Sequence, residues 1–180
     1  MRATALAVAC AMCLACSATD LVGGGGTTYS GPFSGQLSRS TAGQGNSGGG
    51  VISCVNTYTL SGTLSMTLTQ SGTAVAGSGS LNGAETETGK SGDPTCPLYG
   101  NKTIAWSGPV TGTTTALSFL EQSVSTNGSY VQTNKATFSG TLAGGTVAGT
   151  LTMSWAGSGV LPNATFVTQS GASTMTVTLR

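Results

Sequence analysis

The most regular feature of the chain is an alternation of apolar and hydroxylated residues from Thr57 to Gln70, TYTLSGTLSMTLTQ. Every even position from Tyr58 to Leu68 is apolar or glycine, and every odd position from Thr57 to Thr69 is serine or threonine. A period of two predicts a strand that buries one face and leaves the other in water. We expect the hydroxylated face to be the outer one, since the chain has few charged residues to keep it solvated.

The alternation recurs in other parts of the chain. Ser61–Gly72 reads SGTLSMTLTQSG, and Ala148–Gly159 reads AGTLTMSWAGSG. A second unit, aromatic-x-Gly-x-Leu, occurs at Phe33–Leu37 and at Phe138–Leu142. The irregular spacing of these units favours hairpins of one sheet over a solenoid.

Turn signals such as Asn127-Gly128 and Gly144-Gly145 separate the alternating segments. Eight or nine strands joined by short turns predict an all-β antiparallel meander barrel of about eight strands, with a two-sheet β-sandwich as the alternative. The segment Val55–Gln70 is long for a small domain, so we expect a bend at Gly62. The polar stretch Asn82–Asn101 is predicted to be a loop.

The N-terminus has the layout of an export signal. Arg2 precedes the run ATALAVACAMCLACSA, which is too short to span a membrane as a helix. Leu14-Ala15-Cys16 resembles a bacterial lipobox, which would make Cys16 the acylated first residue of a lipoprotein. The alternative is cleavage after Ala18 and simple secretion. We therefore predict an export signal over residues 1–16, a flexible tether over 17–30 and a single β-barrel domain over 31–180.

Only Cys54 and Cys96 remain outside the predicted signal. Two cysteines in an exported chain predict a disulfide, and the alternative is two separate buried thiols. A bridge across about forty residues stabilises the fold by ~3–4 kcal/mol, because it constrains the unfolded chain.

Charge and histidine content limit the functions that we expect. Charged residues make up 6% of the chain, the formal net charge is +1, and there is no histidine. The absence of histidine removes the commonest general base and metal ligand, and the absence of a basic patch argues against nucleic acid. We expect no catalytic residues, no metal and no cofactor. Glu85 and Glu87 form a possible carboxylate pair, but their position in the predicted loop favours solvated surface side chains.

Four aromatic residues occupy apolar phases of the predicted strands, namely Tyr58, Trp106, Phe138 and Trp155. Core packing accounts for them, and the functional alternative is that they line a barrel mouth that binds a small apolar ligand.

The segment Leu68–Leu81, LTQSGTAVAGSGSL, and the glycine-spaced hairpins after it resemble bacterial envelope lipoproteins that have a calycin-type barrel, as in lipocalins or avidin. The resemblance covers roughly Val51 to Arg180. It implies a non-catalytic cell-envelope lipoprotein, anchored in the outer membrane by its lipid, with a structural role or a small apolar ligand. The alternative is a secreted β-sandwich module for adhesion or carbohydrate binding, with a glycan as its partner.

Overall fold

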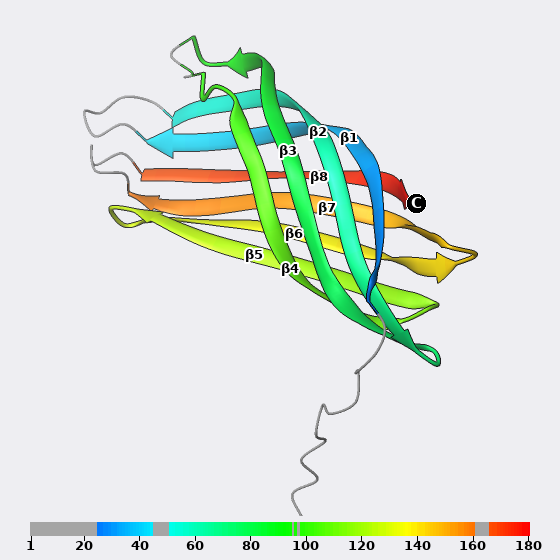
Figure 1. Ribbon diagram of the computed structural model, residues 1–180. Coiled ribbons are helices and arrows are strands. Elements are labelled where there is room, and N and C mark those ends of the chain that lie inside the picture. The colour runs from blue at the N-terminus through cyan, green and yellow to red at the C-terminus, as the bar shows by residue number, and fades with distance from the viewer. Residues whose placement is uncertain (1–24, 45–50, 95, 97, 161–165) are drawn as a thin grey trace, which may run out of the picture.

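The chain folds into a closed barrel of eight antiparallel strands (Figure 1). The computed structural model describes residues 25–44, 51–94, 96, 98–160 and 166–180. The strands are β1 (Thr27–Gln44), β2 (Val51–Ser71), β3 (Ala74–Gly92), β4 (Lys102–Thr113), β5 (Ala116–Asn127), β6 (Tyr130–Ala143), β7 (Thr146–Val160) and β8 (Phe166–Leu179). Each strand pairs with the next in sequence, and β8 pairs with β1. The predicted meander barrel is confirmed, and the two-sheet sandwich is not formed.

The two ends of the barrel differ in their connections. At one end, which we call the hairpin end, two-residue turns join β2 to β3, β4 to β5 and β6 to β7. Both the first residue of β1 and the last of β8 lie at this end, because Thr27 pairs with Leu68 and Leu179 pairs with Val147. The opposite end, the loop end, is where β1, β3, β5 and β7 finish. The chain therefore enters and leaves the barrel at the hairpin end.

The alternation of each strand separates the interior of the barrel from its outer surface. On β1, Phe33 and Leu37 are buried while Ser34 and Ser38 are exposed. Outer hydroxyl groups pair across strands, as in the 2.8 Å contact between Ser30 Oγ and Ser65 Oγ and the 3.2 Å contact between Thr152 Oγ1 and Thr174 Oγ1. The hydroxylated face is thus the outer one, as the sequence predicted. Within the described residues, no helix has the length and apolar character that crossing a membrane requires.

Apolar side chains fill the barrel toward the hairpin end. Burial of this surface supplies the main driving force for folding, at about 25 cal/mol per Å². The buried residues in this half include Leu64, Met66, Leu68, Val75, Val110, Leu117, Phe119, Phe138, Val147, Leu151, Val177 and Leu179.

Glycines on neighbouring strands face each other beneath an aromatic ring. Gly62 on β2 pairs with Gly83 on β3, and a Cβ at Gly62 would lie 2.8 Å from Cζ of Phe33 and 2.3 Å from the carbonyl oxygen of Asn82. Gly62, the predicted bend site, is a close-packing position, and β2 runs through it without interruption. The register of β2 with β3 shifts between Thr57 and Tyr58, which pair with Gly89 and Glu87, so the extra residue, Thr88, lies on β3.

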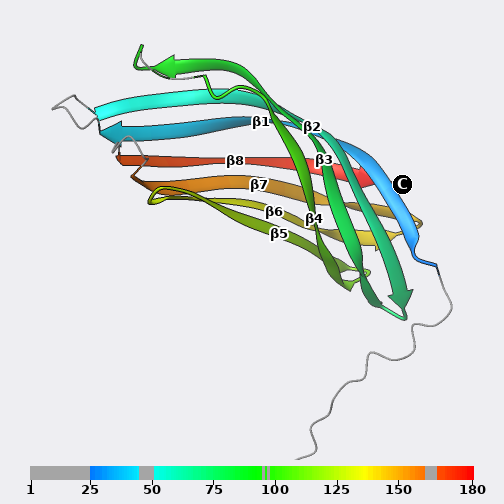
Figure 2. The same ribbon diagram turned by 60° about the vertical axis from the view of Figure 1, so that its left-hand side comes forward.

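The β4–β5 ladder is much shorter than its neighbours. It comprises four residue pairs, from Val110–Phe119 to Thr113–Ala116 next to the hairpin turn. Beyond these pairs β4 continues beside β3, while β5 continues beside β6 (Figures 1 and 2). The barrel wall is therefore continuous around the hairpin end, and the two strands diverge toward the loop end.

Two predicted boundaries differ from the structure. The stretch Asn82–Asn101 was predicted as a loop, but β3 continues through it to Gly92. The prediction was wrong because both faces of this part of β3 are polar, which removes the contrast on which strand recognition depends. Strand β1 begins at Thr27, inside the range predicted as tether. The predicted export signal and Cys16 lie outside the described residues.

Candidate functional site at the loop end

An ion pair is buried inside the barrel on its loop-end side. Arg39 of β1 and Glu85 of β3 both point inward, and their exposed fractions are 0% and 2%. Nη2 of Arg39 donates to Oε2 of Glu85 at 2.5 Å. Removal from water raises the pKa of Glu85 and lowers that of Arg39, and the attraction between the two groups opposes both shifts. The expectation that Glu85 is a solvated surface residue was wrong, because the strand directs it into the barrel.

The Arg39 guanidinium lies over two aromatic rings. Its Cζ is 5.0 Å from the centre of the Tyr58 ring and 4.6 Å from the centre of the Trp155 ring. Gly171 of β8 pairs with both Arg39 and Trp155, and a Cβ at this position would lie 3.0 Å from Cγ of Arg39. Because Gly171 has no side chain, Arg39 can extend across β8 toward β7. Cation–π contacts of this kind stabilise a buried guanidinium that water no longer solvates.

Three of the four predicted ligand-lining residues gather around this ion pair. Trp106 and Trp155 form a tilted pair with ring centroids 6.1 Å apart, and Trp155 and Tyr58 contact Arg39. Phe138 is also buried, but it packs over Gly140 and Gly149 in the apolar half of the barrel. The structure therefore brings Tyr58, Trp106 and Trp155 together and places Phe138 apart from them.

The second carboxylate, Glu87, holds the segment that precedes β4. Its Oε1 accepts a 2.7 Å hydrogen bond from Nδ2 of Asn56, and its Oε2 accepts one of 2.6 Å from the backbone N–H of Gly100. The backbone N–H of Glu87 donates to Oδ1 of Asn101 at 3.0 Å. Glu87 thus fixes the approach to β4 and the position of Tyr99 beside it.

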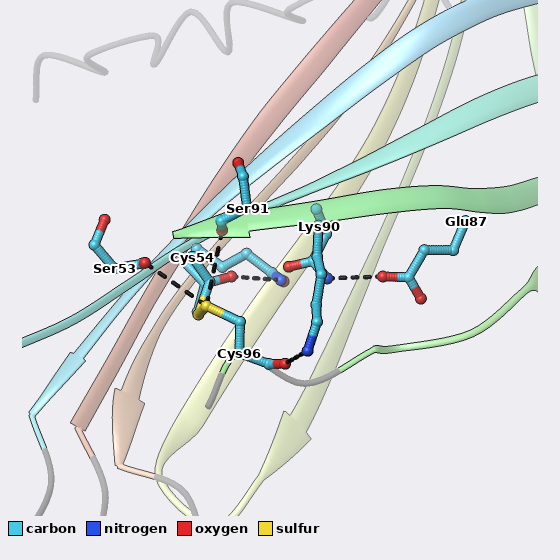
Figure 3. Close-up of a disulfide and its surroundings, with 9 residues drawn as sticks. Ser53, Cys54, Glu87, Lys90, Ser91 and Cys96 are labelled. Carbon is cyan, nitrogen blue, oxygen red and sulfur yellow. Dashed lines mark hydrogen bonds between the residues drawn. A yellow bond between two sulfur atoms is a disulfide. The ribbon is translucent and has the colours of Figure 1, made fainter. Parts of the chain in front are cut away.

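A disulfide attaches the same segment to β2 (Figure 3). Cys54 of β2 is bonded to Cys96 at a sequence separation of 42, which confirms the predicted bridge. Nζ of Lys90 donates to the backbone carbonyl of Cys96. Two independent connections therefore hold the chain between β3 and β4 against the loop end of the barrel.

A cavity of about 110 Å³ opens at this end. It is lined by Tyr99, Lys102, Tyr130, Gln132, Val167 and Gln169. The hydroxyl of Tyr130 donates to Oε1 of Gln169 at 3.4 Å, and Nε2 of Gln169 donates to Oγ1 of Thr41 at 3.2 Å. Burial raises the pKa of Tyr130, so its hydroxyl remains a hydrogen-bond donor at neutral pH.

Lys102 connects the cavity with the buried ion pair. It is the first residue of β4 and pairs directly with Glu85 of β3, which places both side chains on the same face of the sheet. Partial burial and the nearby charge of Arg39 lower the pKa of Lys102. The loop end therefore combines two cations, two carboxylates and aromatic rings, which suits the binding of a small polar molecule. No cluster of three or more metal-ligating side chains occurs among the described residues.

Sequence reasoning missed Arg39, Asn56, Lys102 and Tyr130 as members of this site. The sequence contained one signal for Arg39. Arg39 continues the apolar phase of Phe33, Gly35 and Leu37, so the alternation itself directs a charge inward. The contact with Glu85 could not be predicted, because it depends on strand register.

The chain and its fold were compared with known proteins. No protein-family model, no curated protein and no solved structure matched.

Proposed function

We propose that this chain is an exported, non-catalytic protein of the cell envelope whose calycin-like barrel binds a small ligand at its loop end. The observation that carries the proposal is the buried Arg39–Glu85 pair beside a cavity lined by hydrogen-bonding side chains. A buried ion pair contributes little net stability, and apolar residues of similar volume serve stability as well or better. The apolar half of the same barrel shows that this chain can fill an interior with apolar side chains. The charges at the loop end are therefore best explained by recognition of a ligand.

The envelope setting rests on the sequence. The lipobox-like Leu14-Ala15-Cys16 supports acylation of Cys16 and attachment to the outer membrane, with secretion after cleavage at Ala18 as the alternative. The disulfide between Cys54 and Cys96 suits an oxidising compartment. Because the chain enters the barrel at the hairpin end, an anchored barrel would direct its loop end away from the membrane surface.

Lipid attachment is tested by labelling. The full chain is expressed with its own leader in a bacterial host supplied with radiolabelled palmitate, beside the Cys16→Ser variant and the matched Cys13→Ser variant. We expect label on the wild type and on Cys13→Ser and none on Cys16→Ser. Equal labelling of all three proteins, or none on any, would refute the anchor and leave secretion.

Ligand binding is tested by native mass spectrometry of the full chain purified without denaturation. We expect an added mass that is released on unfolding. The double variant Arg39→Met with Glu85→Leu keeps an apolar interior and should fold without the added mass, whereas Thr63→Ala on the outer face should retain it. A wild-type protein that carries no added mass and shows no thermal shift with any small molecule would indicate a purely structural barrel.

A further inference from the structure

Several hydrogen-bond acceptors at the loop end are already occupied by protein donors, although Oε1 of Glu85 is buried and has no hydrogen-bond partner among the described residues. The Glu85 carboxylate contacts Arg39, and the Glu87 carboxylate accepts hydrogen bonds from Asn56 and Gly100. The side-chain oxygen of Asn101 accepts the backbone N–H of Glu87. A ligand that offers mainly donors would have to displace these contacts.

Several donors are also without an acceptor. Nε and Nη1 of Arg39 are fully buried and have no hydrogen-bond partner within the described part of the chain. Lys102 lines the cavity, and among the described residues its ammonium forms no hydrogen bond or ion pair. Buried donors without acceptors are costly, and together with the unpaired ammonium of Lys102 they favour a ligand that brings acceptor oxygens.

The unpaired charge of Lys102 favours an acceptor with negative charge. Burial and the charge of Arg39 lower the pKa of the Lys102 ammonium, and the charges of Glu85 and Glu87 oppose this shift. The carboxylate of Glu85 is shared with Arg39 and lies opposite Lys102 without forming an ion pair with it. An anion bound beside Lys102 would offset the repulsion between the two cations.

The remaining walls of the cavity are aromatic and apolar. Tyr99 and Tyr130 line it with their rings, and Val167 adds an aliphatic surface. The cavity has a volume of about 110 Å³, which suits a small organic molecule. A bare inorganic anion would leave these apolar walls without a contact, whereas a small organic acid fills both parts of the cavity.

We propose that the loop-end cavity binds a small organic carboxylate whose acid group pairs with Lys102 and whose apolar part packs on Tyr99, Tyr130 and Val167. This inference rests on the proposed ligand-binding function. The positive charge of Arg39 acts on Lys102 from outside the cavity, and Gln132 and Gln169 contribute amide groups to the cavity lining. Neutral and cationic analogues of the same shape are discriminated against, because they leave the ammonium of Lys102 without a partner.

The test uses probes that differ only in the proposed contacts. Binding of benzoate, benzamide, acetate and inorganic phosphate to the full chain is measured by NMR titration, following the signals of Tyr99, Tyr130 and Val167. We expect benzoate to bind most tightly, with benzamide at least about tenfold weaker, as loss of a charge-assisted hydrogen bond predicts. Acetate should be weaker because it lacks the apolar part.

Two lysine variants distinguish binding in the cavity from a general attraction of anions to positive charge on the protein. Lys102→Gln should weaken benzoate binding by at least about tenfold, whereas Lys135→Gln, which removes an exposed lysine on the outer face of β6, should leave it unchanged. Tyr99→Ala should weaken benzoate more than acetate. Both lysine variants should retain the wild-type unfolding temperature within about 3 °C, since surface substitutions change stability by about 0.5 kcal/mol or less.

Distinct outcomes would overturn the inference and the proposed function. Equal affinity for benzoate and benzamide, an unchanged affinity in Lys102→Gln, or tighter binding of phosphate than benzoate would refute the carboxylate proposal while leaving a ligand site. If none of the four probes binds but a neutral molecule co-purifies with the protein, the carboxylate proposal is also refuted and the ligand site remains. Failure of all four probes with no co-purifying molecule would refute both.

Discussion

The Arg39 guanidinium of β1 contacts the Glu85 carboxylate of β3 inside the barrel, across the intervening strand β2. Both side chains are withdrawn from water, and the guanidinium also lies over the rings of Tyr58 and Trp155. This pair divides the interior into an apolar half toward the hairpin end and a polar half toward the loop end.

Removing one partner of the pair should destabilise the barrel far more than removing both. Arg39→Met leaves a buried carboxylate without its cation, and we expect the free energy of unfolding to fall by about 3–5 kcal/mol. The double variant Arg39→Met with Glu85→Leu should be within about 1 kcal/mol of the wild type or more stable. Urea denaturation of the single and double variants measures the coupling. A double variant as unstable as Arg39→Met alone would show that the two side chains act independently.

The stability of the barrel should depend on the titration of Glu85. Burial raises the pKa of this carboxyl above its ordinary value of 4.5, so the folded state binds the proton more tightly than the unfolded state. The associated stability is fully present below pH 4.5 and is lost as the pH rises through the raised pKa. Relative to Glu85→Gln, the wild type should therefore lose stability over this range. A difference between the two proteins that stays constant from pH 4 to pH 8 would contradict the prediction.

Tyr58 should ionise later than an exposed tyrosine. Burial and the nearby Glu87 raise the pKa of Tyr58 to about 12. Absorbance at the tyrosinate band should show one residue titrating near this pH, and that step should be missing from Tyr58→Phe. The hydroxyl has no hydrogen-bond partner in the described part of the chain, so Tyr58→Phe should be at least as stable as the wild type at pH 7. A loss above 1 kcal/mol would indicate an unrecognised hydrogen bond to this hydroxyl.

The disulfide should stabilise the whole barrel and fix the segment before β4. The Cys54→Ala, Cys96→Ala double variant should lose about 3–4 kcal/mol, because the bridge closes a loop of 42 residues in the unfolded chain. Reduction of the wild type under native conditions should give a similar decrease in the denaturation midpoint. The double variant itself should not respond to reductant. Unchanged stability of the variant would show that the fold does not depend on this bridge.

A methyl group at Gly62 should disrupt the packing of β1, β2 and β3. The added Cβ would lie 2.3 Å from the carbonyl oxygen of Asn82 and 2.7 Å from Cα of Gly83, both backbone atoms that cannot move independently. We expect Gly62→Ala to lose about 2 kcal/mol or more, in the range of overpacked cores. Gly144→Ala provides a contrast, since a Cβ there meets no atom within 4 Å and only the φ of +57° opposes it. Thermal unfolding of both variants compares steric and conformational effects.

The sequence by itself determined that this protein is built from about eight antiparallel strands, and it left a barrel and a two-sheet sandwich as alternatives. The Thr57–Gln70 alternation has a period that only a half-buried strand satisfies, and its recurrence between turn signals specified an antiparallel meander of about eight strands. It also placed Tyr58, Trp106 and Trp155 on the inward phase. The pairing of Cys54 with Cys96 followed because these are the only two cysteines outside the predicted signal.

Only the tertiary structure decided where the charges lie. Glu85 and Glu87 occur in a stretch that is polar on both faces, so periodicity could not show that β3 continues to Gly92 with one carboxylate buried. The partner of Glu85 is 46 residues away on a strand that is not its neighbour, and barrel curvature brings the two together. Period specifies which face a side chain takes, because alternation is a local property of the backbone. Register and closure specify which inward side chains meet, because they depend on the pairing of all eight strands.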